Sequence, residues 1–502
     1  MIRLFCIVAA VALAVAACDD DSSPPSTPAP QNEAETFSLG VASGDVKPDS
    51  AVLWTRADGA ESVTAEITTS EDFGGDVQEI AAETSEERDF TLKAVASGLQ
   101  PDTRYYYRLH AGDATSATGT FVTAPDASAS RPLHFVFSGD SDGRRDEDGN
   151  PAFNEFEVLD AAREENPDFF LYFGDTIYGD RDPVAEDLDG YRAKYRENRG
   201  YHALADILAA TSTYNTWDDH EVYNDYAGTA VDEDRFDDAL QAFREYMPID
   251  DAGDPGVLYR TFRWGKDVEI IVLDTRSFRD AEADVTCEDD PLPAGAFGDA
   301  PQALRGIREF VGLADDLPDG CEDMIRDESR TVLGDEQQQF LFDRLSESDA
   351  TWKIVVNSVP IQALLIEPYD RWDGYPAARR ELLEYIRDEG IDNVVFLTTD
   401  FHANIFGPVR IDQFGGDDEP VAYEAIAGPI ATNPFRQDIV ELVGEDAADA
   451  TQGLLTGLLG VDCADIDSYA YALVDVDAAS MTITAKDEDR NVLCEKRLEA
   501  KQ

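Results

Sequence analysis

The chain has 502 residues, more than one hydrophobic core usually serves, so two domains are expected. Hydrophobic residues make up 43% of it and aromatic residues 10%, which can build packed cores and argues against a disordered polyanion. Its 40 Lys and Arg against 105 Asp and Glu give a net charge of −65, which disfavours nucleic acids and anionic lipids as partners because phosphate groups are bound by Lys and Arg.

The first 18 residues have the pattern of an export signal. Arg3 precedes an apolar run over 4–17 that is too short to span a bilayer as a mature helix. The run ends Val15-Ala16-Ala17-Cys18, which resembles a bacterial lipobox, and ordinary signal-peptidase cleavage nearby is the alternative. The resemblance implies a lipid on Cys18 and an exported lipoprotein anchored in a membrane, in the periplasm or at the cell surface. Residues 19–36, rich in Asp, Ser and Pro, predict a flexible tether.

Residues 37–125 predict a small all-β domain. Short runs with alternating apolar residues, such as 51–55 and 105–109, are separated by Gly, Pro and Asp turns, as in a β-sandwich. The segment 99–107 resembles the fibronectin type III signature before its penultimate strands.

From residue 131 to the C-terminus, strands alternate with helices, which predicts an α/β domain. A helix is expected over 154–165, and the tail from 469 onward predicts an antiparallel addition to the main sheet. Buried strands are expected at 133–137, 169–173, 268–273, 352–356 and 393–397. Each of these strands runs into polar residues. Because ligands of α/β sheets bind outside the carboxyl ends of the strands, these ends should converge on one site.

Four cysteines remain once Cys6 is assigned to the signal and Cys18 to the lipid. An even number in an exported protein suggests two disulfides, most simply Cys287–Cys321 and Cys463–Cys494, and the sequence leaves the other two pairings open.

The stretch from Trp217 to Asp225 concentrates polar chemistry. It places four carboxylates, an imidazole and an amide in nine residues without any Lys or Arg. Hard cations bind several anionic oxygens, and imidazole suits transition metals, so a metal or phosphate site is favoured over a solvated acidic turn. Together with the strand ends, the pattern describes a carboxylate-rich centre for two cations. Its candidate members are Asp142, Asp175, Tyr178, Asp219, His220, Asn357, Asp400 and His402.

These motifs resemble those of PhoD-type alkaline phosphatases in the calcineurin-like metallophosphatase superfamily. The matching segments are Gly174-Asp175-Thr176-Ile177-Tyr178, Trp217-Asp218-Asp219-His220-Glu221, Leu273-Asp274-Thr275-Arg276, Leu333-Gly334-Asp335-Glu336-Gln337, Arg371-Trp372-Asp373-Gly374-Tyr375-Pro376 and Asp400-Phe401-His402. The resemblance runs from about Phe37 to the C-terminus. It implies a fibronectin III-like or Ig-like front domain over 37–125 and, over 131–502, an α/β metallophosphatase domain whose β-sandwich is flanked by helices.

The resemblance also implies roles for these residues. Asp175 would bridge the metals, and Tyr178 would bind ferric iron as a phenolate. His220 would face the substrate phosphate, and Arg276 and Arg371 would offset its charge. Further ligands would be Asp142, Asp219, Asn357, Asp400 and His402. The expected metals are Ca²⁺ with Fe³⁺, and a metal-bound hydroxide would attack phosphorus in line with the leaving alcohol.

One position departs from the family pattern. PhoD proteins usually have Ser-Cys after the first strand, with the Cys binding iron, whereas this chain has Ser138-Gly139. If another ligand such as Asp140 completes the site, the preference shifts from iron towards Mn²⁺, Mg²⁺ or Ca²⁺.

The sequence thus predicts an exported, lipid-anchored, metal-dependent phosphohydrolase that cleaves phosphomonoesters, phosphodiesters or both. One alternative is a dedicated phosphodiesterase or phospholipase D. The other is a non-catalytic, calcium-binding surface lipoprotein, which Gly139 favours.

Overall fold

The computed structural model describes residues 36–228, 231–287, 317–364, 368–412, 419–457 and 460–501. The predicted signal peptide, Cys18 and the tether up to residue 35 lie outside these ranges. Over the described part of the chain, no helix combines the length and apolar character needed to cross a membrane.

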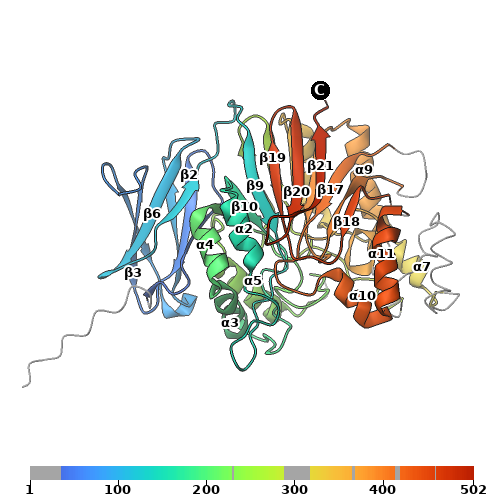
Figure 1. The fold of residues 1–502 in the computed structure, drawn as a ribbon, viewed down its shortest axis with the longest axis horizontal. Helices are drawn as coiled ribbons and strands as arrows, with labels where there is room; N and C mark the ends of the chain where they lie inside the picture. The colour runs from blue at the N-terminus through green and yellow to red at the C-terminus, as the bar shows by residue number, and fades with distance from the viewer. Residues whose placement is uncertain are drawn as a thin grey trace, which may run out of the picture.

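Two large sheets form the centre of the molecule (Figure 1). The first has nine strands in the order β21 (Val492–Glu499), β20 (Ser480–Lys486), β19 (Tyr471–Val476), β9 (Leu133–Ser138), β10 (Phe169–Tyr172), β11 (Ser212–Tyr214), β1 (Val41–Gly44), β2 (Ser50–Arg56) and β5 (Thr91–Ser97). The second has seven in the order β12 (Arg260–Trp264), β13 (Val268–Val272), β14 (Trp352–Val356), β15 (Val394–Thr398), β17 (Ala422–Ile426), β16 (Asn404–Val409) and β18 (Cys463–Asp465).

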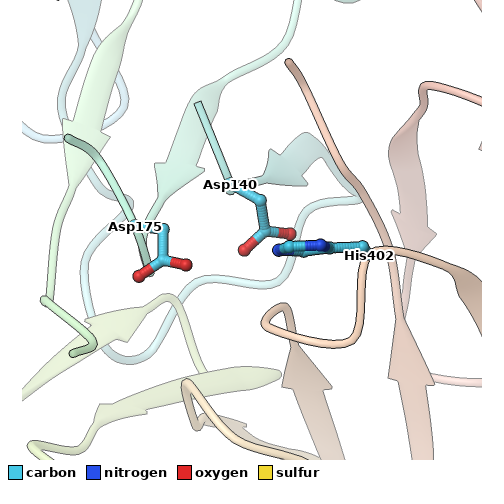
Figure 2. Close-up of side chains that lie close together, drawn as sticks. All are labelled: Asp140, Asp175 and His402. Carbon is cyan, nitrogen blue, oxygen red and sulfur yellow. The ribbon is translucent and has the colours of Figure 1, made fainter. Parts of the chain in front are cut away.

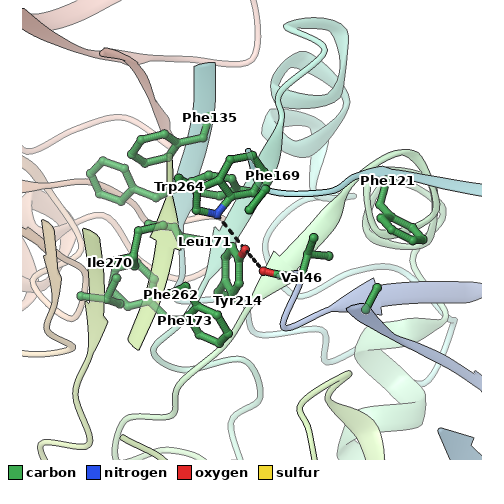
Figure 3. Close-up of a cluster of buried hydrophobic side chains, with 14 of the residues drawn as sticks. Val46, Phe121, Phe135, Phe169, Leu171, Phe173, Tyr214, Phe262, Trp264 and Ile270 are labelled. Carbon is green, nitrogen blue, oxygen red and sulfur yellow. Dashed lines mark hydrogen bonds between the residues drawn. The ribbon is translucent and has the colours of Figure 1, made fainter. Parts of the chain in front are cut away.

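The five strands predicted after residue 131 are present as β9, β10, β13, β14 and β15. Within each sheet they run parallel, so their carboxyl ends share one edge. The predicted antiparallel tail is confirmed, because β19 pairs antiparallel with β9 and continues through β20 to β21. Apolar residues on the facing sides of the two sheets, such as Phe135, Phe169, Ile270 and Phe262, form one core between them (Figure 3).

Helices cover the outer faces of both sheets, as expected for an α/β sandwich. The nine-stranded sheet is covered by α2 (Glu157–Glu164), α3 (Leu188–Arg199), α4 (His202–Ala210) and α5 (Glu233–Tyr246), which share a core with Phe170 and Tyr172 of β10. The seven-stranded sheet is covered by α8 (Gly334–Glu347) and α9 (Pro376–Asp388), which pack on Val355 and Phe396. The remaining helical segments are α7 (Cys321–Ile325), α10 (Phe435–Val443), α11 (Glu445–Gly457) and the 3₁₀ turns η1 (Glu86–Arg88), η2 (Pro368–Asp370) and η3 (Trp372–Gly374).

The front region forms the predicted β-sandwich. One layer is a sheet of β4 (Gln78–Glu83), β3 (Ser62–Thr68), β6 (Arg104–Ala111) and β7 (Ala114–Thr115), with β8 (Gly119–Val122) also paired to β6. The other layer is β1, β2 and β5, which belong to the nine-stranded sheet because β1 pairs in parallel with β11. Strand pairing therefore continues across the predicted boundary between the front and catalytic domains.

Both expected disulfides are confirmed. Cys287 is joined to Cys321, and Cys463 to Cys494. The first closes a small core of Ala283, Ile325 and Tyr369.

Candidate metal centre

The loops that follow the carboxyl ends of the parallel strands meet in one cavity of about 430 Å³. Asp175 and Asp219 reach it from loops after β10 and β11, and Asp400 and His402 reach it from the loop after β15. The site therefore lies where the two sheets meet, as the strand ends predicted.

The first candidate ligand group consists of Asp140, Asp175 and His402, whose side chains point toward one another (Figure 2). Each offers an oxygen or nitrogen atom, and these atoms all lie within 4.8 Å of one another. The backbone φ angles are 59°, 46° and 51°, in the left-handed region that non-glycine residues seldom occupy. Three such residues in one cluster indicate that the fold tolerates local strain in order to aim these side chains.

A second group consists of Asp175, Asp219 and His220, and a third of Asp219, Asp225 and Asp370. Asp175 belongs to the first two groups, so it is placed to bridge two cations. Asp219 likewise connects the second group to the third.

Asp140 and Asp175, at the centre of this cluster, make no ion pair with a Lys or Arg among the described residues. Burial raises the pKa of Asp140 to about 7; His402 lowers it and Asp400 raises it. Burial, with Asp219 next, raises the pKa of Asp175 well above the ordinary range. The Oδ2 atom of Asp140 is buried and accepts no hydrogen bond from the described residues. Unpaired carboxylate oxygens at a buried site are unfavourable without a cation, so the donor set fits hard metal ions.

His220 is held as a cation beside this cluster. Its Nδ1 lies 2.7 Å from Asp180 Oδ1, and its ring centroid lies 4.3 Å from that of Tyr178. Burial lowers the pKa of His220, but Asp219 and Asp180 outweigh burial and bring the pKa to about 9. Asp180 was not among the predicted site residues, although its position on the same loop, five residues after Asp175, could have indicated it.

Tyr178 lies between the two histidines of the site. Its hydroxyl is 3.2 Å from His402 Nε2. Burial, followed by the charge of Asp175, raises its pKa well above the ordinary value, so the phenol stays protonated unless a cation binds it.

Asp400 lines the cavity, and it forms an ion pair with Arg371. Arg371 Nε donates to Asp400 Oδ2 at 2.8 Å, and the Asp400 N–H donates to Asp140 Oδ1 at 3.1 Å. Both Arg371 and the exposed Arg181 line the cavity, so two guanidinium groups place positive charge on its wall.

Three predicted site residues are engaged elsewhere. Asp142 accepts two hydrogen bonds from Arg144 Nε and belongs to none of the three acidic groups found in the described residues. The Asn357 amide donates to Val359 O and accepts from Trp372 Nε1. Arg276 is fully buried and does not itself line the cavity; it binds Asp218 and Asp370 from behind the cavity wall, and its Nη2 lies 3.4 Å from Asp219 Oδ1.

Gly139 explains why Asp140 rather than a residue at 139 faces the cluster. A Cβ atom at Gly139 would lie 2.1 Å from Phe173 O and 2.7 Å from Gly174 O. No side chain fits there without moving the backbone. After the first strand it is therefore the side chain of Asp140 that faces the cluster, at the position next to the one where the family usually has cysteine.

Two solved structures share this architecture. One, described as the structure of PhoD, superposes with a TM-score of 0.73 at 23% identity and covers 94% of each chain. The other, the purple acid phosphatase PPD1 from yellow lupin seeds (Lupinus luteus), superposes with a TM-score of 0.57 at 12% identity and covers 92% of this chain and 73% of its own. The chain therefore has the fold of these two proteins, and its acidic, histidine-containing site lies where the two central sheets meet.

The sequence comparisons assign the family. The family model described as PhoD-like phosphatase matches residues 149–485, and the model of the PhoD-like phosphatase N-terminal domain matches 22–125. Alkaline phosphatase D of Bacillus subtilis (strain 168) is 29% identical over 430 residues, which are 76% of this chain and 67% of that protein. The chain belongs to the PhoD-like phosphatase family. It is a metal-dependent phosphoric ester hydrolase, as the sequence motifs predicted.

Proposed function

We propose that the chain is an exported, lipid-anchored phosphohydrolase that cleaves both phosphomonoesters and phosphodiesters with two hard cations. The observation that carries this proposal is the pair of overlapping ligand groups that share Asp175. The cavity of about 430 Å³ beside them is open enough for an ester with an organic substituent on either side of phosphorus.

We assign one cation to Asp140, Asp175 and His402, with Tyr178 as a further donor, and the second to Asp175 and Asp219. These donors are mostly carboxylate oxygens, which favour Ca²⁺, Mn²⁺ or Mg²⁺ over an iron centre that depends on a thiolate. When bound, the metal ions supply Lewis-acid polarisation of the phosphoryl oxygens and lower the pKa of water. Asp142 and Asn357 are left out of this ligand set because their side chains are bound to Arg144 and Trp372.

The chain's own residues then bind and orient the ester. Arg181 and Arg371, at the cavity wall, attract the phosphate. The His220 imidazolium, oriented by Asp180, donates a proton or a hydrogen bond to the leaving alcohol or a phosphoryl oxygen. Arg276 positions Asp218 and Asp370 rather than touching the substrate.

The first test measures the metal content of the purified chain together with hydrolysis of 4-nitrophenyl phosphate and bis(4-nitrophenyl) phosphate, with Ca²⁺ or Mn²⁺ and after chelation. Turnover of both esters that a chelator abolishes is expected. Cleavage of the diester alone would favour the dedicated phosphodiesterase. Bound iron at one equivalent would contradict the oxygen-ligand assignment.

The lipid anchor is tested separately in a bacterial host. Incorporation of labelled palmitate that is lost in Cys18→Ser is expected. A mature N-terminus on either side of residue 18 without lipid would show ordinary signal-peptidase cleavage instead. On the proposed processing, the mature protein begins at the lipid-bearing Cys18, which is followed by a tether over 19–36, the front domain over 37–125 and the catalytic domain over 131–502.

A further inference from the structure

We propose that Asp45 of the front domain and Arg260 of β12 are positioning residues for the loop that carries Asp219 and His220. On this view the front domain is part of the catalytic machinery, because it holds one side of the strand from which that loop emerges.

The order of the strands places the front domain beside the strand that leads to the site. β11 leads directly to Asn215 and then to Asp219, and it lies between β10 and β1. Its pairing with β1 is parallel, with Ser43 opposite Ser212 and Gly44 opposite Thr213. Without the front region, β11 would be an edge strand with unpaired backbone groups on the side away from β10. The contact is close, since a Cβ atom at Gly44 would lie 2.8 Å from Thr213 O.

Asp45 follows β1 and closes this contact. Its N–H donates to Thr213 O at 3.2 Å, and its φ of 45° turns the chain away from the sheet. The carboxylate is 2% exposed and accepts from Arg260 Nη2 at 2.8 Å and from the Asp250 N–H at 2.8 Å.

Arg260 extends the contact to the loop. Its Nη2 also donates to Asn215 O at 2.9 Å, so a single guanidinium joins the front-domain carboxylate to the main chain four residues before Asp219. A planar guanidinium can make both contacts at once, whereas a lysine ammonium on a flexible stem cannot reproduce that geometry.

A second set of bonds reinforces this arrangement. The Tyr214 hydroxyl donates to Val46 O at 2.7 Å and accepts from Trp264 Nε1 at 2.8 Å (Figure 3). Val46, Tyr214 and Trp264 thus connect the front region, β11 and β12 through one buried chain of hydrogen bonds.

The downstream part of the loop is held on the opposite side by the catalytic domain. Thr216 Oγ1 donates to Leu273 O at 2.7 Å, and the Gly174 N–H donates to Thr216 O at 3.2 Å. The segment before Asp219 is therefore clamped between the front domain and the loop that carries Asp175. Loss of one side of the clamp should release Asp219 from the position it shares with Asp175.

The test uses the full mature chain and two variants of the clamp, Asp45→Asn and Arg260→Lys. The matched control is Asp89→Asn. Asp89 also joins the front domain to the catalytic domain, through Arg196 and Tyr246, and within the described part of the chain its bonds avoid residues 212–219. Amide hydrogen exchange of the peptide spanning 212–222 is measured well below the melting temperature, together with kcat and KM for 4-nitrophenyl phosphate.

Both clamp variants should raise exchange of this peptide and lower kcat by about ten-fold or more with little change in KM, since small displacements of catalytic groups are costly. Asp89→Asn should lower the melting temperature without either effect. Equal exchange in all three variants, or unchanged exchange in both clamp variants, would overturn the inference. Arg260→Lys keeps the charge beside Asp45, so it gives a result even if Asp45→Asn does not fold. The exchange readout is independent of turnover, so a failure of the proposed ester chemistry would leave this test intact.

Discussion

The two walls of the site differ in how they balance charge. On the wall from the nine-stranded sheet, Asp140 and Asp175 have raised pKa values and make no ion pair with a Lys or Arg among the described residues. On the wall from the seven-stranded sheet, the acids are paired, Asp370 with Arg276 and Asp400 with Arg371, although burial still raises the pKa of Asp400.

Because of this difference, we expect substitutions on the two walls to have different effects, one on catalysis and the other on stability. The carboxylates of the paired wall have arginine partners within the chain. Arg276 and Arg279 hold the pKa of Asp370 well below its usual range despite burial. The unpaired wall lacks its counter-charge, and bound cations would supply it. Acids on the unpaired wall should therefore control metal binding and turnover, whereas the arginines of the paired wall should control folding.

The largest effect is expected for Asp175→Asn. Substitution of residues that merely support a ligand usually costs 10–100-fold, so loss of a ligand common to both cations should lower kcat by more than about 100-fold and reduce bound metal. The metal-free variant should be at least as stable as the parent, because a repelled buried carboxylate is replaced by a neutral amide. Elemental analysis, kinetics and urea unfolding measure the three quantities. A large loss of stability of the metal-free variant would show that Asp175 stabilises the fold, as the arginines of the paired wall are expected to do.

The opposite result is expected for Arg276→Met. Removing one partner of a buried ion pair leaves its carboxylates uncompensated, and the free energy of unfolding should fall by about 3–5 kcal/mol. The control is Arg344→Met, which breaks a partly exposed pair with Glu347 and should cost about 1 kcal/mol or less. If Arg276→Met unfolds normally and loses only activity, Arg276 acts on substrate, as the family resemblance first implied.

Asp140 and Asp142 provide the sharpest comparison, because they lie two residues apart on one loop. Asp140→Asn should weaken Mn²⁺ binding by about ten-fold or more, since it removes an anionic ligand from the first group. Asp142→Asn should change Mn²⁺ affinity little, because an amide can still accept from Arg144. Titration with Mn²⁺ against a competing chelator measures both affinities. A greater loss in Asp142→Asn would restore the assignment made from the sequence.

The same two residues show what the sequence could predict. The buried strands were found because strands covered on both faces have continuous apolar runs, as in Phe169–Tyr172, and their polar ends identified the region of the site. The choice between Asp140 and Asp142 depends on the left-handed backbone at Asp140, and residue spacing carries no information about that angle.

Pairs of residues that are far apart along the chain also could not be predicted from the sequence. Arg276 has the charge of a phosphate-binding residue and lies in a motif of the family, but its partners Asp218 and Asp370 come from segments 58 and 94 residues away. Only the fold brings these carboxylates to it. The link from β1 to β11 was missed for the same reason, because parallel pairing between distant strands leaves no local signal.

The stability of the metal-free protein should depend on pH because of the acids on the unpaired wall. The pKa of Asp140 in the folded state, about 7, exceeds its unfolded value of about 4. The folded state therefore binds more protons in this interval, and stability should fall as pH rises from about 4 to about 7. Asp140→Asn should flatten this slope, and saturating Ca²⁺ should reverse it in the parent. Urea unfolding across pH, with and without chelator, tests the sign, and a parent and variant with the same slope would contradict it.

The smallest effect is expected at the boundary between the walls, where Asp180 supports His220. Because Asp180 contributes to the raised His220 pKa of about 9, Asp180→Asn should lower that pKa. If the imidazolium donates to the reacting ester, the alkaline limb of the kcat profile should move to lower pH in the variant. His220→Asn should remove that limb, and a remote substitution such as Asp349→Asn, at a side chain that is 93% exposed, should leave it in place. A limb that stays at the same pH in Asp180→Asn would show that another group, such as a metal ligand, sets it, and would move His220 from proton donor to the ligand set with Asp175 and Asp219.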